Sequence, residues 1–169
     1  RAHGRSVSRR VLVTGGGRRL GAVICEAFAR AGWQVWCQYR ASRDAAETLC
    51  AGLRDEGFAA TAIEADIDDE GARQALVEHI SADTPLACIV NNASAFEPDT
   101  ALDFKPDAAL RQLGVNLIAP MSFARLLAQQ PADGTDRSTI HIPLSLEKAQ
   151  VRIAPHCDHV ANADGERGV

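Results

Sequence analysis

The sequence predicts an α/β protein: a doubly wound, Rossmann-like domain in three layers around a parallel sheet. Three observations support this fold class. From residue 10 onward, short β-rich apolar runs alternate with amphipathic helical stretches, and a glycine-rich turn joins the first run to the first helix. With 169 residues, 46% of them hydrophobic and 24% charged, the chain has the composition of one folded domain. A regular alternation of strands and helices is typical of a parallel sheet with helices on both faces.

The elements follow one another in a regular order. The run RVLVT at residues 10–14 reads as a buried first strand, and the helix expected at residues 20–31 has one apolar face and ends at Gly32. Later strands are expected at residues 33–38, 58–64, 86–90 and 139–142. The remaining helices are expected at 42–56, 68–81 and 105–130, the last with Pro120 as a kink. Ligands of such sheets bind beyond the carboxyl ends of the strands.

Composition divides the chain into three parts. Residues 1–9 predict a basic, disordered leader, because the apolar stretch that follows them is too short for an export signal. Residues 10–142 form the folded domain, and residues 143–169 form a poorly specified tail. Five widely spaced cysteines without a CxxC pair favour reduced thiols and a cytoplasmic location. The net charge of −4 and the lack of a long apolar run argue against nucleic-acid and membrane partners.

The turn after the first strand reads TGGGRRLG, from Thr14 to Gly21. Glycines allow a tight turn and a close backbone approach to a phosphate group. The N–H groups and the positive end of the following helix point at the same place. The sequence therefore predicts a phosphate-binding turn, with an ordinary strand-to-helix turn as the alternative.

This turn resembles the TGxxxGxG element of short-chain dehydrogenases/reductases, and Arg19 at its penultimate glycine position resembles the pteridine-reductase branch. Further segments agree in order and spacing: Ala65-Asp66-Ile67, then NNAS at residues 91–94, then Asn116 within a helix. The resemblance covers residues 10–142, implies the strand order 3-2-1-4-5, and leaves out the family's C-terminal part. It implies that the dinucleotide is bound by Gly15, Gly17, Arg18, Arg19, Leu20, Gly21, Asp66, Ile67, Asn92, Ala93 and Ser94.

The end of the second strand predicts which dinucleotide is bound. An NAD-binding protein would place Asp or Glu there to hold the ribose hydroxyls. This chain instead offers Tyr39, Arg40, Ser42 and Arg43. Cations and hydroxyls suit a 2′-phosphate, so NADP(H) is the expected cofactor. The alternative is an ordinary charged start of a helix.

The resemblance also implies a substrate side of the site. In pteridine reductases a serine and a phenylalanine after the fourth strand line the pterin pocket, and Ser94 and Phe96 match them. A flat, pterin-like small molecule is thus the expected substrate, although a phenylalanine in a loop also serves as a core residue. The family's long helix packs against a partner subunit, so the resemblance also implies a homo-oligomer, which the missing neighbouring helix of this chain would weaken.

The catalytic residues of the family are matched only in part. Asn116 matches the helix asparagine, but the Tyr-x-x-x-Lys pair has no counterpart, because the one tyrosine is Tyr39. The segment most similar to this pair has Leu144 at the position of the tyrosine and Lys148 at the position of the lysine. Ser145 is a weak substitute for the catalytic tyrosine. A shift of reading frame or an internal deletion would each explain the tail.

Three functions therefore remain open. The first is an NADP(H)-dependent short-chain oxidoreductase that reduces a pterin-like or other carbonyl or imine substrate and is catalytically incomplete in this chain. The others are a non-catalytic nucleotide-binding module and a truncation product. The HCDH run at residues 156–159 lacks the spacing of a zinc site, so no metal is expected.

Overall fold

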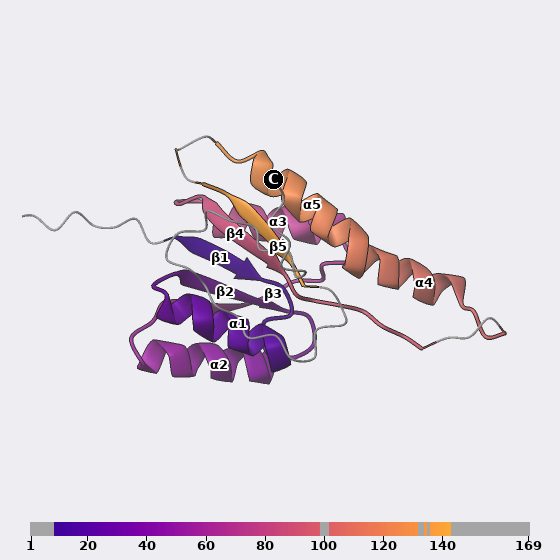
Figure 1. Cartoon of the computed structure of the whole chain (residues 1–169), viewed down its shortest axis with the longest axis horizontal. Coiled ribbons are helices and arrows are strands. Elements are labelled where there is room, and N and C mark those ends of the chain that lie inside the picture. The colour runs from indigo at the N-terminus through magenta and orange to yellow at the C-terminus, as the bar shows by residue number, and fades with distance from the viewer. Residues whose placement is uncertain (1–8, 99–101, 132–133, 135, 143–169) are drawn as a thin grey trace, which may run out of the picture.

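Five parallel strands form one sheet in the order β3-β2-β1-β4-β5, which confirms the expected fold class and strand order (Figure 1). The computed structural model describes residues 9–98, 102–131, 134 and 136–142. The expected leader up to residue 8, the tail from residue 143 and the candidates Ser145, Lys148 and 156–159 lie outside these residues. The strands are β1 (Arg10–Val13), β2 (Gln34–Tyr39), β3 (Ala60–Glu64), β4 (Leu86–Asn91) and β5 (Ser138–His141).

Helices cover both faces of the sheet (Figure 1). They are α1 (Arg19–Arg30), α2 (Arg43–Asp55), α3 (Glu70–Ile80), α4 (Pro106–Leu113) and α5 (Ala119–Ala128). The first two pack on one face, and α3 and α5 pack on the other. The first and last residues of each strand and helix lie within two residues of the bounds expected from the sequence, except in the helical stretch at 105–130.

Two apolar cores form because successive side chains of a strand point to opposite faces. Val11 and Val13 belong to the core under α1 and α2, whereas Leu12 between them belongs to the core under α3 and α5. Every residue of β1 and β4 is buried. Such near-continuous apolar strands are typical of a parallel sheet that is covered on both faces.

The expected single helix over residues 105–130 is interrupted by a π-helical turn, η1 (Gly114–Ile118). The N–H of Ala119 donates to the carbonyl of Gly114, five residues back. Pro120 has no N–H with which to continue the regular α-helical ladder, which explains why the helix widens here instead of merely kinking. A side chain at Gly114 would overlap the exposed Asp68 carboxylate, which would have to shift to make room for it.

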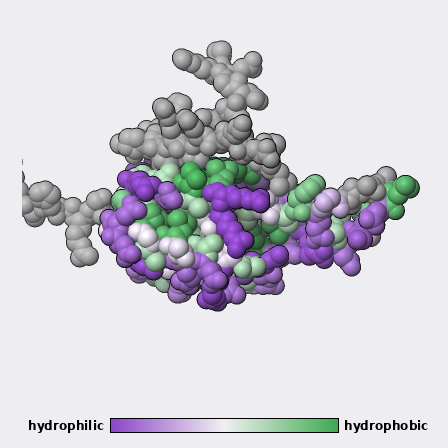
Figure 2. Space-filling view, turned by 90° about the horizontal axis from the view of Figure 1, so that it is seen from below, coloured by the Kyte–Doolittle hydropathy of each residue, from purple (hydrophilic) through white to green (hydrophobic). Residues whose placement is uncertain are grey.

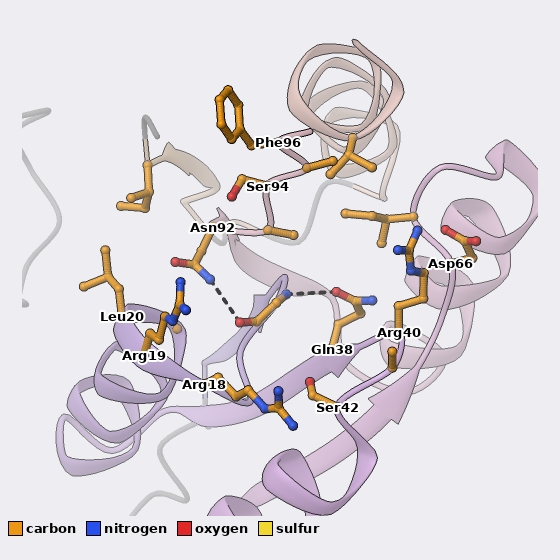
Figure 3. A pocket seen from close by; sticks show the side chains of 18 residues that line it. Arg18, Arg19, Leu20, Gln38, Arg40, Ser42, Asp66, Asn92, Ser94 and Phe96 are labelled. Carbon is orange, nitrogen blue, oxygen red and sulfur yellow. Dashed lines mark hydrogen bonds between the residues drawn. The ribbon is translucent and has the colours of Figure 1, made fainter. Parts of the chain in front are cut away.

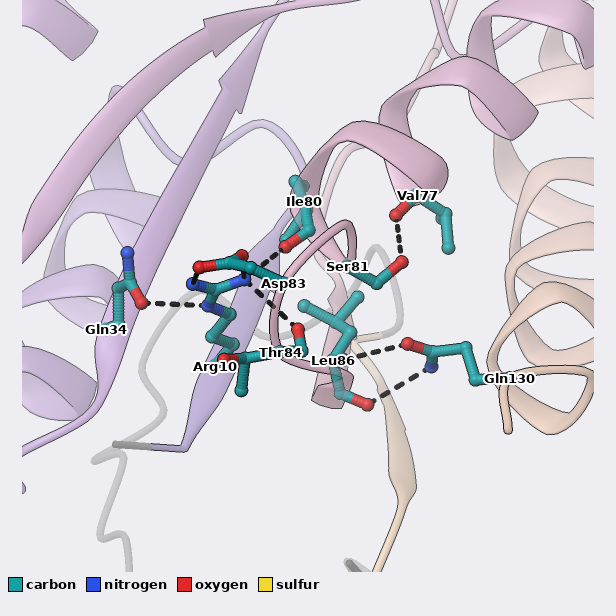
Figure 4. A network of polar contacts seen from close by, with 9 residues as sticks. All are labelled: Arg10, Gln34, Val77, Ile80, Ser81, Asp83, Thr84, Leu86 and Gln130. Atoms are coloured by element: carbon teal, nitrogen blue, oxygen red, sulfur yellow. Dashed lines mark hydrogen bonds and ion pairs between the residues drawn. The ribbon is translucent and has the colours of Figure 1, made fainter. Parts of the chain in front are cut away.

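The amino-terminal edge of the sheet is held by a polar network around Arg10 (Figure 4). The buried Arg10 guanidinium donates to Gln34 Oε1 at 2.8 Å, to the Ile80 carbonyl at 2.7 Å and to the Asp83 carboxylate. The Gln130 amide accepts from the Leu86 N–H at 2.8 Å and donates to the Leu86 carbonyl at 3.2 Å. These contacts connect the starts of β1, β2 and β4, and they leave the carboxyl-terminal edge for a ligand.

Among the described residues, no helix combines the length and the apolar character needed to cross a membrane.

Candidate functional site

A cavity of about 1410 Å³ opens at the carboxyl-terminal edge of the sheet. Parallel strands all end at this edge, so loops that are distant in the sequence meet here. Figure 3 shows Arg40 and Asp66 on one side of the cavity and Ser94 and Phe96 on another. The lining residues are Gly15, Arg18, Arg19, Leu20, Gly21, Gln38, Arg40, Ala41, Ser42, Asp66, Ile67, Asn92, Ala93, Ser94, Ala95, Phe96, Val115 and Ile142.

Gly15 is held from two sides by the hydrogen bonds that Figure 3 draws as dashed lines from Gln38 and Asn92. Its N–H donates to Gln38 Oε1 at 3.0 Å, and its carbonyl accepts from Asn92 Nδ2 at 3.1 Å. The Thr14 hydroxyl accepts the N–H groups of Asn92 and Ala93 at 3.1 and 3.0 Å. The glycine-rich turn is thereby tied to β2 and to the segment after β4. Gly15 has a φ of +61°, a conformation that favours glycine.

The start of α1 lies close beneath the turn because Gly21 has no side chain. A Cβ at Gly21 would overlap the Gly15 carbonyl oxygen and approach Asn92 Nδ2 to 2.7 Å. At Gly17 the close neighbour is α2 instead, because a Cβ there would lie 3.1 Å from Ala46. Gly17 therefore permits helix packing, and it is not among the residues that line the cavity.

The N-terminus of α1 faces the cavity with its backbone donors uncapped. The N-cap residue Arg18 makes no side-chain capping hydrogen bond, and no acidic residue lies in the first turn. The first N–H groups of a helix have no partner within it and attract anions. Arg18 and Arg19 are exposed beside them. Arg19 has a φ of +49°, a conformation that favours glycine, and the family pattern has a glycine at this position.

The end of β2 brings Arg40, Ala41 and Ser42 into the cavity lining, without a carboxylate among them. Tyr39 and Arg43, by contrast, lie outside the lining. Tyr39 is buried, and the Arg43 guanidinium lies 5.5 Å from the centre of its ring. Arg43 also forms ion pairs with Glu64 and Glu47. Arg40 is therefore the cation after β2 that lines the cavity.

The segment after β4 carries Ser94 and Phe96, both exposed in the cavity wall. Asn116, in the π-helical turn, holds this segment: its Oδ1 accepts from the Ala95 N–H at 2.9 Å and its Nδ2 donates to the Ala95 carbonyl at 2.8 Å. Asn116 is not itself a lining residue. Its geometry supports a positioning role, and its expected catalytic role stays a prediction.

The structure thus brings the sequence-predicted cofactor and substrate residues into one cavity lining, except Gly17, Tyr39 and Arg43. Sequence reasoning missed five lining residues: Gln38, Ala41, Ala95, Val115 and Ile142. A polar Gln38 near the end of an otherwise apolar strand was the one signal that could have been used. The other four carry apolar side chains that sequence alone does not separate from core or loop residues.

Other reactive side chains form no second site within the described residues. Cys25, Cys37, Cys50 and Cys88 are buried in the core. Hydrogen bonding to Cys25 and burial raise the pKa of Cys37, so this thiol stays protonated. In the same part of the chain, no group of three or more His, Cys, Asp or Glu side chains is arranged to hold a metal ion.

Comparison with known proteins agrees with this geometry. The profile of the family described as short chain dehydrogenase matches residues 9–140. Versicolorin reductase stcU from Emericella nidulans is 34% identical over 118 residues, which are 68% of this chain and 44% of that protein.

Solved structures show the same likeness. FolM alternative dihydrofolate reductase 1 from Brucella canis, complexed with NADP, has a TM-score of 0.72 at 30% identity and matches 79% of this chain and 53% of its own. A short chain dehydrogenase from Burkholderia cenocepacia in complex with NADP has a TM-score of 0.71 at 31% identity and matches 78% and 54%. The chain spans about half the length of the proteins that it matches.

The Gly21 contacts lead to a prediction. Gly21→Ala should destabilise the fold by about 1–3 kcal/mol, because the new methyl group overpacks the turn against a backbone carbonyl. Gly52 lies inside α2 with nothing within 4 Å of its Cβ position, so Gly52→Ala should stabilise by about 0.5–1 kcal/mol. Urea unfolding of both variants measures the difference. Equal stability of the two variants would contradict the packing described for the turn.

Proposed function

The chain belongs to the short-chain dehydrogenase family, and on this premise we propose that it binds NADP(H) at the carboxyl-terminal edge of its sheet. The observation that carries the proposal is the glycine turn at the uncapped start of α1, with arginines beside it and no carboxylate after β2. When bound, NADP(H) supplies or accepts a hydride. The residues that line the cavity would hold and orient it.

The residues fit the parts of such a dinucleotide. The start of α1 has no side-chain cap, so its first backbone N–H groups can contact a pyrophosphate directly, and Gly21 lets the turn pack against this helix start. Asp66 and Ile67 line the neighbouring side of the cavity and suit the adenosine. Asn92 and Ala93 line the cavity on the side of β4, along which the rest of the dinucleotide would extend.

The preference for NADP(H) over NAD(H) rests on Arg40 and Ser42. Both line the cavity immediately after β2. A guanidinium and a hydroxyl can each hydrogen-bond a 2′-phosphate, and charge-assisted bonds of this kind are the strong ones. Arg43 is committed to Glu64 and Glu47, which leaves Arg40 as the main determinant.

A flat, pterin-like substrate is the proposed reaction partner. Phe96 is 71% exposed and belongs to the cavity wall, and Ser94 lies two residues before it. An exposed aromatic ring beside a hydroxyl offers stacking and one hydrogen bond to a heterocycle. The NADP complex of FolM alternative dihydrofolate reductase supports this choice of substrate class by analogy.

Reduction of a carbonyl or imine also needs a proton donor near the developing negative charge. The one tyrosine, Tyr39, is the last residue of β2, is buried in the core and is not a lining residue. Among the charged residues that line the cavity, Arg18, Arg19 and Arg40 are poor proton donors, and Asp66 lies beside Ile67 on the adenosine side. We therefore propose that these 169 residues bind the cofactor without efficient turnover.

The second candidate function is a non-catalytic nucleotide-binding module. It uses the same cofactor residues as the oxidoreductase, but it assigns no substrate to Ser94 and Phe96. We also propose a homo-oligomer in the cytoplasm. An exposed apolar row on α4, η1 and α5 supports self-association, and it comprises Leu110, Leu113, Leu117 and Met121. In Figure 2 the part of the molecule with α4 extends as an arm, and the face seen there is mostly hydrophilic, with hydrophobic residues at its outer end.

The cofactor preference can be tested by titration. The chain should bind NADPH more tightly than NADH by about tenfold or more, because of the charge-assisted contacts to the 2′-phosphate. Arg40→Asp should reduce or reverse this preference, whereas Arg43→Asp, a matched change outside the cavity, should leave it nearly intact. Quenching or enhancement of NAD(P)H fluorescence provides the measurement. Equal affinity of the unmodified chain for both cofactors would defeat the assignment.

Turnover gives a separate test. The purified 169-residue chain should oxidise NADPH with dihydropterin or quinonoid substrates no faster than a buffer control, since a positioned proton donor typically contributes ~10²–10⁴-fold. A variant with a family-like Tyr-x-x-x-Lys segment after β5 should recover activity. Rapid NADPH oxidation by the unmodified chain would refute the proposal, and Ser145 and Lys148 would then be the first residues to mutate.

A further inference from the structure

Gln38 is a buried polar side chain that joins two separate segments of the site. It lies near the end of β2 and is 2% exposed. Its Oε1 accepts from the Gly15 N–H at 3.0 Å, and its Nε2 donates to the Ala65 carbonyl at 2.6 Å. Gly15 begins the glycine turn, and Ala65 directly precedes Asp66 and Ile67. One amide therefore connects the phosphate side of the cavity with the adenosine side.

The chemistry of this contact suits an amide at residue 38. The group must accept one hydrogen bond and donate another while remaining uncharged in a buried place, and a glutamine side chain does both. The backbone of β2 also bonds to these two segments. The Gly16 N–H donates to the Gln38 carbonyl at 3.0 Å, and the Ala65 N–H donates to the Tyr39 carbonyl at 3.0 Å. The backbone bonds set the distance between segments, and the Gln38 side chain orients the Gly15 and Ala65 peptides.

We propose that Gln38 is a positioning residue that fixes the glycine turn against residues 65–67 and thereby sets the affinity for the dinucleotide. The inference rests on the proposed NADP(H) site and adds a determinant that does not depend on the 2′-phosphate. Pre-organisation of both segments lowers the free-energy cost of ordering them when the ligand binds. Loss of the amide should therefore weaken NADP⁺ and NAD⁺ by the same factor.

The first variant removes both hydrogen bonds at similar volume. Gln38→Met should weaken NADP⁺ binding by about tenfold in isothermal titration calorimetry, as expected for the loss of two neutral hydrogen bonds that pre-organise the site. Gln34 provides a matched control on the same strand, because its amide accepts from Arg10 at 2.8 Å at the opposite edge of the sheet. Gln34→Met should lower thermal stability and leave the affinity for NADP⁺ unchanged.

The second variant separates hydrogen bonding from packing and charge. Gln38→Glu at about pH 8 carries a carboxylate, which repels the Ala65 carbonyl and the cofactor phosphates, so binding should be weaker than in Gln38→Met. At about pH 5 the buried carboxyl gains a proton and can again donate and accept, and affinity should return toward that of the unmodified chain. Each affinity is taken relative to the unmodified chain at the same pH. This ratio removes every effect of pH that the variant shares with the unmodified chain.

The outcomes distinguish the inference from the function on which it rests. If the unmodified chain binds no NADP⁺, the proposed function fails, and the inference fails with it. If it binds NADP⁺ and Gln38→Met binds equally well, only the positioning role is overturned. The same holds if Gln38→Glu at about pH 5 stays as weak as Gln38→Met. Should Gln38→Met not fold, the comparison of Gln38→Glu with the unmodified chain at the two pH values still decides the question.

Discussion

The peptide of Gly15 is the point on which the site depends. Its N–H is engaged by Gln38 of β2, its carbonyl by Asn92 after β4, and its φ of +61° favours a residue without a side chain. These contacts fix the turn between β1 and α1 from both neighbouring strands. The uncapped start of α1 is thereby directed into the cavity, where its N–H groups and the adjacent arginines favour an anion.

The two edges of the sheet have different roles: the amino-terminal edge is stabilised by polar contacts, and the carboxyl-terminal edge forms the cavity. At the amino-terminal edge, Arg10 and Gln130 satisfy backbone carbonyls and carboxylates around the starts of three strands. At the carboxyl-terminal edge, hydrogen bonds orient peptides around open space instead of filling it. The π-helical turn extends this arrangement, because it brings the Asn116 amide to the backbone of Ala95 and so supports the segment with Ser94 and Phe96.

Local sequence patterns predicted the fold class and the glycine turn, whereas the family resemblance supplied the strand order and the cavity residues after β3 and β4. A buried strand, a glycine turn and an amphipathic helix form within one continuous stretch, so Gly15, Gly21 and the arginines between them could be placed from their order alone. Gln38 and Val115 could not, because their place in the lining depends on how distant segments meet. The π-helical turn was also missed: Pro120 indicates a disturbed helix, but a proline alone does not distinguish a π-helical turn from a simple kink. Tyr39 was misleading because its ring turns into the core beneath Arg43.

The central claim is that the glycine turn and the end of β2 together form one dinucleotide site. A crystal structure of the chain with NADP⁺ tests it most directly. The account predicts the pyrophosphate at the N-terminus of α1 beside Gly21 and the 2′-phosphate against Arg40 and Ser42. Electron density for the dinucleotide at another place, or a 2′-phosphate that contacts neither Arg40 nor Ser42, would contradict it.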